Sequence, residues 1–114
     1  MSTILNESAS IREESYTWWQ FKLRNESGVR IKVISSPNWI GVNIYVMTEG
    51  EFRNFKKGKI FNYFSSLSYE NAVDFNGSAV LSDGKYYIVI QNPNRYYDGE
   101  ENIAKVSMRL DLLM

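Results

Sequence analysis

The 114-residue chain contains no cysteine and no histidine. Without cysteine the protein has no disulfide framework and no thiol nucleophile, and without histidine it has no imidazole base and no Ser-His-Asp triad. Zinc sites built from these two residue types are excluded as well. Carboxylates are therefore the main side chains left from which a catalytic or metal-binding site can be built.

An excess of one charge and long apolar runs are also missing. The 13 Lys and Arg residues balance the 13 Asp and Glu residues, so the formal net charge is zero. Domains that bind nucleic acid through phosphate contacts are normally basic, and we expect no nucleic-acid partner. No run approaches the roughly 18 apolar residues of a membrane-spanning helix, and residues 1–10 lack the features of a signal peptide. The sequence predicts no membrane span, and it leaves the compartment unknown, with the cytoplasm as the default.

Length and composition predict one globular domain over residues 1–114. Hydrophobic residues make up 44% of the chain and charged residues 23%. This is ordinary globular composition and argues against disorder. A chain of this size buries about two thirds of its surface on folding, which supports a core without disulfides or structural metals.

Alternation of apolar and polar residues dominates the chain. The clearest case is residues 103–112, where Ala, Val, Met and Leu side chains alternate with Lys, Ser, Arg and Asp. A period of two predicts a strand with one buried face. Further strands are predicted at residues 16–23, 29–35, 42–46 and 85–91. The last of these is apolar on both faces, as expected for a strand in the middle of a sheet.

Two stretches allow more than one interpretation. Residues 59–68 predict a loop or a short edge strand. Residues 71–81 predict either a hairpin that turns at Asn76-Gly77 or one long strand with a glycine bulge. Asp83-Gly84 predicts a second tight turn, directly before residues 85–91.

One short helix interrupts the strands. The segment from Thr48 to Glu51 matches a capping box, in which the Thr side chain accepts from the third helical amide and the Glu side chain reaches back. We therefore predict a helix that begins at Glu49 and ends at Lys57. Its single pair of apolar side chains predicts that it plugs one end of a sheet and forms no layer of its own.

Together these elements predict an all-β fold, an antiparallel β-sandwich of about seven to eight strands with one short helix. Short strands separated by frequent turn signals are typical of such sandwiches. A doubly wound α/β fold would need a crossover helix after most strands, and the sequence predicts only one helix.

The order of three segments gives the chain a family resemblance. The strand VNIYV at residues 42–46 leads into EFRNFKKG at residues 51–58, and DGKYYIVIQN follows at residues 83–92. In this order they resemble GOLD-like and bacterial pre-peptidase C-terminal-like β-sandwich modules, over residues 29–112. The resemblance implies a non-enzymatic module that mediates protein interaction, cargo or surface association, or that accompanies a larger enzyme.

Aromatic residues make up 15% of the chain, and four of them lie outside the predicted core. Trp18 is on the polar face of its strand, Trp39 follows a break at proline, and Tyr96 and Tyr97 belong to the polar loop before the last strand. Gathered on one surface, they would form an amphipathic platform for a protein partner or a sugar ring. The aromatic residues predicted to be core are Trp19, Phe21, Phe52 and Phe55.

The carboxylates give a weaker signal. Asp98 and Glu100 lie in the same polar loop among asparagines, which makes them a candidate oxygen site for Ca²⁺, although their spacing matches no EF-hand. The paired acids elsewhere are sequence neighbours, and neighbours on a strand point to opposite faces, which does not suit a glycosidase. We expect no enzyme, no cofactor and no metal, with the calcium site as the alternative.

Basic residues gather near the end of the predicted helix. They are Arg53, Lys56, Lys57 and Lys59. Cations in the last turn compensate the helix dipole, which is the simpler interpretation. A site for an anion or an acidic partner is the alternative.

The function predicted from these observations is a non-catalytic module that binds a protein partner or a second copy of itself. The alternative is a β-sandwich that binds carbohydrate or another small ligand, with calcium as an aid. Residues 8–11 and 29–35 are the candidate edge segments for pairing with a second copy, because unpaired strand edges invite such contacts.

Overall fold

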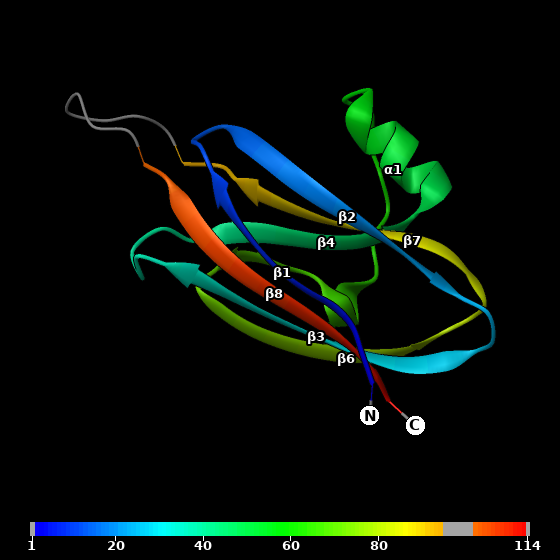
Figure 1. Cartoon of the computed structure of the whole chain (residues 1–114). Helices are drawn as coiled ribbons and strands as arrows, with labels where there is room; N and C mark the ends of the chain where they lie inside the picture. Colours follow the sequence, from blue (N-terminus) through cyan, green and yellow to red (C-terminus); the bar gives the residue numbers. More distant parts are fainter. Residues whose placement is uncertain (1, 95–101, 114) are drawn as a thin grey trace.

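The computed structural model describes residues 2–94 and 102–113. They form two four-stranded antiparallel sheets packed face to face, with one α-helix (Figure 1), which confirms the predicted fold class. The strands are β1 (Ser2–Ile11), β2 (Ser15–Leu23), β3 (Ser27–Ser36), β4 (Val42–Thr48), β5 (Tyr69–Ala72), β6 (Asp74–Leu81), β7 (Gly84–Asn92) and β8 (Ala104–Leu113). The helix α1 spans Glu49–Lys56, and a short 3₁₀ turn, η1, spans Ser65–Leu67.

The strand order places the edges of both sheets. The first sheet, called sheet A below, has the order β1-β8-β3-β6, and the second, sheet B, has the order β2-β7-β4-β5. Because β3 pairs with both β8 and β6, residues 29–35 lie inside sheet A, and their prediction as an edge segment was wrong. Residues 8–11 do lie on an edge strand, since β1 pairs only with β8.

Strand β1 has a weak sequence pattern because its core-facing side is partly exposed. Glu7 lies opposite the buried Met108 and therefore shares its face, yet Glu7 is exposed at the edge of the sheet. A charged side chain turned inward on an edge strand discourages pairing with another chain. The charge of Glu7 also interrupts the alternation of apolar and polar residues. The sequence pattern therefore did not predict a strand at residues 2–7.

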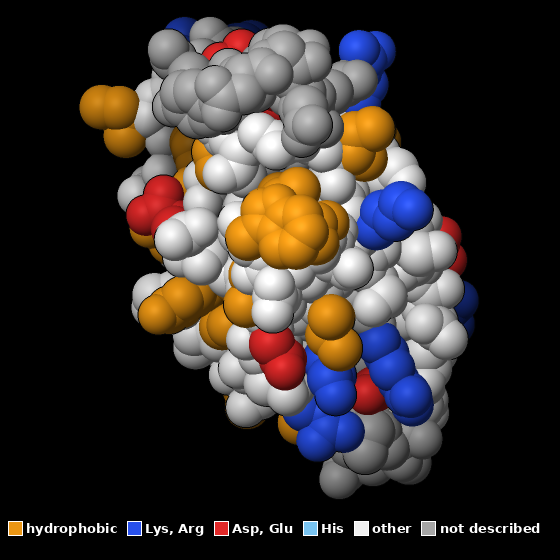
Figure 2. Space-filling model, turned by 90° about the vertical axis from the view of Figure 1, so that its left-hand side faces the viewer, with side chains coloured by type: hydrophobic (Ala, Val, Ile, Leu, Met, Phe, Trp, Pro, Cys, Tyr) orange, Lys and Arg blue, Asp and Glu red, His pale blue; other side chains and the backbone are white. Residues whose placement is uncertain are grey.

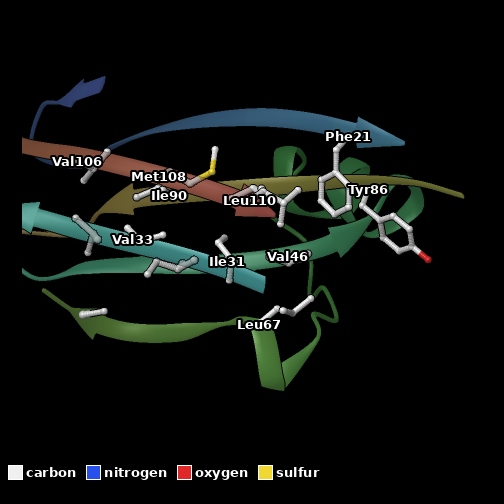
Figure 3. Close-up of a cluster of buried hydrophobic side chains, with 14 of the residues drawn as sticks. Phe21, Ile31, Val33, Val46, Leu67, Tyr86, Ile90, Val106, Met108 and Leu110 are labelled. Carbon is white, nitrogen blue, oxygen red and sulfur yellow. The ribbon is translucent and has the colours of Figure 1, made fainter. Parts of the chain in front are cut away.

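The main core fills the space between the two sheets, as Figure 3 shows for side chains from β2, β3, β4, β7, β8 and η1. The inward side chains of residues 42–46, 85–91 and 103–112 meet there, as predicted. The largest fully buried side chains include Ile31, Ile44, Ile88, Ile90, Met108 and Leu110. Burying an aliphatic side chain of this size contributes roughly 1.5–3 kcal/mol, so this layer is the main source of stability.

A second, smaller cluster lies on the outer face of sheet B, between the sheet and α1. Tyr45, Met47, Tyr87 and Val89 point outward from β4 and β7 and are buried together with Phe52 of the helix. The Phe52 and Tyr87 rings stack with their centroids 4.2 Å apart. The helix therefore covers the outer face of a sheet that is apolar on both sides, and the prediction that it plugs a sheet end was wrong.

Residues 59–68 form a loop, one of the two alternatives predicted for them. The loop returns from α1 and ends in η1, where Leu67 is fully buried and joins the main core. It leads into the short edge strand β5, which pairs with β4. Leu67 thus fastens the end of this connection to the main core, against which Phe64 of the same loop also packs.

Residues 74–81 form one continuous strand, so the predicted hairpin at Asn76-Gly77 was wrong. Asn76 pairs with Lys32 and Gly77 with Ile31, without a break in register, and the alternative of a bulge does not occur either. Gly77 is required for a different reason. A Cβ atom there would collide with the main-chain oxygen of Ser66 and the ring of Phe75, because η1 packs closely against β6.

Replacing Leu67 by alanine should lower the free energy of unfolding by about 2–5 kcal/mol, because it leaves a cavity under η1. Urea unfolding followed by circular dichroism measures the change. The matched control is Ile60→Ala in the same loop, where the side chain is 94% exposed. The control should change stability by less than about 0.5 kcal/mol. Equal effects of the two substitutions would contradict the packing described here.

Gly77→Ala should destabilise the protein by about 1–3 kcal/mol, since the added methyl group has no space against the η1 backbone. Gly28→Ala is the control, because it adds the same methyl group to a strand where the nearest atom, Cβ of Leu113, is 3.4 Å away. Thermal and urea unfolding compare the two. A Gly77 variant as stable as the Gly28 variant would show that η1 does not pack against β6 in this way.

Candidate functional site

Three strand connections lie at one end of the sandwich, at the left in Figure 1, together with the end of β7 and the start of β8. The three connections join β1 to β2, β3 to β4 and β5 to β6. The register places them together: Ile11 pairs with Ala104, Ser15 with Asn92, Ser36 with Lys105 and Val42 with Ala72. We call this the loop end, and its described residues are 12–14, 37–41, 73, 93, 94, 102 and 103. Loops held together by a rigid sandwich are a common location for binding surfaces.

Two asparagine side chains fasten the connections of the loop end to one another. The Asn92 Nδ2 group donates to the main-chain oxygens of Ile11 (2.9 Å) and Asn102 (3.0 Å). The Asn94 Nδ2 group donates to the main-chain oxygen of Gly41 (3.0 Å) and to Oδ1 of Asn92 (2.7 Å). The loop end is thus a hydrogen-bonded unit that links β1, β4 and β7.

Trp39 is the most exposed aromatic side chain of the described residues, at 76%. Its neighbours hold its turn in place: the Ile40 amide donates to the Pro37 oxygen (3.0 Å), and the Ser35 hydroxyl donates to the Ile40 oxygen (2.7 Å). Ile40 itself is buried in the main core. The indole therefore projects into solvent from a fixed backbone. Figure 2 shows exposed hydrophobic side chains on this side of the molecule.

Glu13 adds an unusual feature to the loop end. Its Oε2 atom is buried and has no hydrogen-bond partner among the described residues. Buried polar atoms without partners are rare and cost free energy. Sequence reasoning placed Glu13 only as one of two adjacent acids and gave no signal for its burial.

Trp18 lies on a different surface from Trp39. It is on the outer face of sheet B, 46% exposed, with its ring 5.2 Å from that of Phe52 and 5.6 Å from that of Tyr87. Its neighbour on this face, Tyr16, meets the Phe55 ring edge-on at 4.9 Å. The polar face predicted for β2 is therefore half covered by α1, and Trp18 mainly packs the helix against the sheet.

The other predicted site residues fall on the part of the chain outside the described ranges. These are Tyr96 and Tyr97 of the aromatic set and Asp98 and Glu100 of the calcium alternative. Their contribution stays a prediction. Among residues 2–94 and 102–113, no group of three or more acids is placed to hold a metal ion.

The basic residues near the end of α1 are partly engaged in structural contacts. Arg53 lies 3.8 Å from the Glu49 carboxylate, and the Lys56 ammonium group lies 4.9 Å above the Phe52 ring. Lys57 and Lys59 are exposed. These contacts favour the interpretation that the cations stabilise the helix.

Glu51 performs only part of the capping role predicted for it. Its amide donates to the Thr48 hydroxyl (3.4 Å), as a capping box requires. Its carboxylate accepts from the Asn62 amide (3.0 Å) and the Asn54 side chain (3.2 Å) rather than reaching back. The hydrogen bond from the Asn62 main chain is the largest influence that lowers the pKa of Glu51. Glu51 therefore ties the returning loop to the helix.

A basic cluster on the outer face of sheet A was missed by the sequence analysis. Arg30, Lys32 and Arg109 line a shallow depression of about 370 Å³ with Asn76 and Asp111. Figure 2 shows a group of Lys and Arg side chains around an acidic one in the lower part of that view. The alternating pattern of residues 103–112 placed Arg109 and Asp111 on the polar face of the last strand, but only the strand register brings β3 and β8 side by side.

Asp111 is the buried acid of this cluster, with a side chain only 6% exposed. Its Oδ1 atom accepts from Arg109 Nε (2.9 Å) and from the Thr3 hydroxyl (3.0 Å), and Arg30 Nη2 lies 3.7 Å from Oδ2. The hydrogen bond from Arg109 is the largest influence on the pKa of Asp111 and lowers it, while burial acts in the opposite direction.

Other acids of the described chain also have structural partners. Glu49 lies 3.5 Å from the Lys85 ammonium group and accepts from the Tyr87 hydroxyl (3.3 Å). Glu70 accepts a 2.6 Å hydrogen bond from Tyr45, whose burial raises the pKa of the phenol. The arrangement of these acids stabilises strands and the helix, and it resembles no general acid–base pair across a cleft.

Comparisons with known proteins bear on the fold. No protein-family model matches the sequence, and no curated protein matches it. Among solved structures, the chain is similar to the pre-peptidase C-terminal domain of collagenase from Bacillus anthracis, with 15% identity and a TM-score of 0.61, covering 94% of this chain and 90% of that one.

It is also similar to PliG, a periplasmic lysozyme inhibitor of g-type lysozyme. The Aeromonas hydrophila protein has 15% identity and a TM-score of 0.60, covering 96% of this chain and 85% of its own. The Salmonella Typhimurium protein has 20% identity and a TM-score of 0.57, covering 96% and 90%. At these identities the likeness establishes the fold. The chain has a β-sandwich like that of the pre-peptidase C-terminal domain, as its sequence resemblance predicted.

Replacing Asp111 by asparagine should lower the free energy of unfolding at neutral pH, and this loss should shrink as the pH falls below about 4. The pKa of Asp111 is lower in the folded state than the roughly 3.9 of an unfolded chain. Its contribution is therefore complete above that value and is lost as the pH falls through the folded-state pKa. Urea unfolding at a series of pH values measures the difference.

Asp74→Asn is the control for the Asp111 experiment. It makes the same chemical change at an exposed position of the same sheet face, on β6. The control should show little difference from the wild-type protein at any pH. A loss for Asp111→Asn that stays constant or grows in acid would contradict the charge cluster.

Proposed function

We propose that this chain is a non-catalytic protein-binding module whose contact surface is the loop end, with Trp39 as its anchor. The observation that carries the proposal is the 76% exposure of this indole on a turn that is hydrogen-bonded on both sides. Tryptophan is among the residues most often found at the energetic centre of protein interfaces. A turn whose backbone is already held in position loses little conformational freedom when a partner covers it.

The connections around Trp39 support this interpretation. Asn94 binds the main-chain oxygen of Gly41, two residues after Trp39, and Asn92 fixes the end of β7 to β1. A partner that contacts the loop end therefore meets several connections held in one arrangement. The Oε2 atom of Glu13, which has no hydrogen-bond partner among the described residues, lies at the same end.

The non-catalytic part of the proposal rests on residue chemistry. The chain has neither cysteine nor histidine, and the carboxylates of Glu49, Glu51, Glu70 and Asp111 are engaged by neighbouring groups. The structural neighbours agree with this interpretation. One is named as a domain of a collagenase and two as inhibitors of a g-type lysozyme, a protein target.

Self-association is a second form of the same proposal. The β1 edge is the remaining candidate edge, and its inward Glu7 opposes pairing with a second copy. The Trp39 turn carries no such inward charge on a strand edge.

Carbohydrate binding is the alternative function, supported by the flat exposed face that an indole presents to a sugar ring.

Trp39→Ala should abolish most partner binding while changing stability by less than about 0.5 kcal/mol. Proteins captured by the immobilised wild-type chain are identified by mass spectrometry and purified. Each purified partner is then titrated by calorimetry against the wild-type protein and the variant. A g-type lysozyme is included as a defined protein probe. Loss of an anchor tryptophan costs at least about 2 kcal/mol, which corresponds to a roughly 30-fold weaker Kd. Sedimentation of the wild-type protein and of the Trp39→Ala variant tests self-association, which the substitution should weaken as well.

Ile60→Ala serves as the matched control, because it removes an even more exposed apolar side chain from the loop after α1. This variant should bind the purified partner like the wild-type protein. The proposal is wrong if Trp39→Ala retains full affinity, or if the only saturable ligand, measured by tryptophan fluorescence, is a polysaccharide.

A further inference from the structure

The outer face of sheet A gathers three basic side chains around Asp111. Asn6, Arg109, Lys32 and Asn76 form one row across β1, β8, β3 and β6. Arg30 and Asp111 are paired in the neighbouring row. Among the described residues of these two rows, three cations therefore surround the single carboxylate of Asp111. Asp74, an exposed acid of the same face, lies opposite Ile34 in a further row.

Lys32 accounts for the imbalance. It lies directly opposite Arg109 on the adjacent strand and two residues from Arg30 on the same face of β3. Like charges placed opposite each other on a sheet are destabilising. Asp111 lies within ion-pair distance of both arginines, whereas Lys32 forms no ion pair with any described residue. Such a local conflict is typical of a position retained for binding rather than for stability.

The arginine beside Lys32 is held in a fixed orientation. Arg109 donates from Nε to Asp111 (2.9 Å) and from Nη2 to the Thr3 hydroxyl (3.1 Å). Its Nη1 group, on the exposed side of the sheet, has no hydrogen-bond partner among the described residues. A guanidinium group restrained in this way loses less freedom when it meets a carboxylate.

We propose that this face binds an extended acidic segment of a partner protein. The ligand chemistry is a pair of carboxylates on one face of a strand-like peptide. Alternate side chains of an extended chain recur every roughly 6.8 Å. Arg30 and Lys32 are themselves alternate residues of one strand and present positive charge with the same repeat. The amides of Asn6 and Asn76 flank the row as further donors. This site is separate from the Trp39 surface and does not depend on the proposed function.

The probe is a short peptide in which Glu alternates with Ser. It is titrated into the full chain at low ionic strength, and the amide signals of the protein are followed by heteronuclear NMR. We expect saturable shifts centred on Arg30, Lys32 and Arg109, with affinity that falls as salt is added, because the contacts are solvent-exposed. A peptide of the same composition with its Glu residues contiguous should bind more weakly, since its carboxylates point to both sides of an extended chain.

Lys32→Glu should weaken peptide binding about tenfold, since it removes an attraction and adds a repulsion. Lys57→Glu makes the same charge reversal next to α1 and should leave binding unchanged. Lys32→Arg should retain it. Because Lys32→Glu also relieves the repulsion with Arg109, its melting temperature should equal or exceed that of the wild-type protein.

Any of four results would overturn the proposal. The first is equal binding of the alternating and contiguous peptides, which would indicate bulk charge alone. The second is equal weakening by Lys57→Glu. The third is a clear loss of thermal stability in Lys32→Glu, which would give Lys32 a structural role. The fourth is binding to phosphatidylserine vesicles without any binding of the peptide.

Discussion

The structure depends on sheet B being apolar on both faces. Ile88 and Ile90 of β7 point into the space between the sheets, while Tyr87 and Val89 point to the opposite side. Water cannot be excluded from both faces by a second sheet alone, so sheet A covers one and α1 covers the other. This requirement explains why a helix with a single buried side chain, Phe52, is positioned firmly. It also explains why so many rings lie on that outer face.

The sequence was sufficient to predict the fold class because the strands that build the core have a clear period of two. It failed where tertiary contacts overrule local signals. Asn76-Gly77 has the composition of a hairpin turn, but Gly77 is needed for the close approach of η1, and the chain stays extended. The weak alternation of β1 concealed residues 2–7 of this edge strand, of which only residues 8–11 were predicted. The two phenylalanines of α1 gave no indication of which sheet face they would cover.

The candidate surfaces were predictable to different degrees. Trp39 could be identified because it follows a proline break and has no place in the alternating pattern, and it is highly exposed. Trp18 was predicted as a contact residue because it lies on the polar face of its strand, yet it packs against Phe52, a residue far from it in the sequence. The Arg30, Lys32 and Arg109 cluster could not be predicted, because it exists only through the pairing of β3 with β8. The resulting molecule has a loop end with an exposed indole and, separately, a basic sheet face on one β-sandwich scaffold.

Native-state amide hydrogen exchange tests the two-sided burial of sheet B most directly. The account predicts that amides of β7 and of the neighbouring β4 exchange most slowly, at rates set by global unfolding. Amides of the edge strands β1 and β5 should exchange faster through local opening. Exchange in the middle of β7 as fast as in β1 would contradict the claim that β7 is the centre of the sandwich.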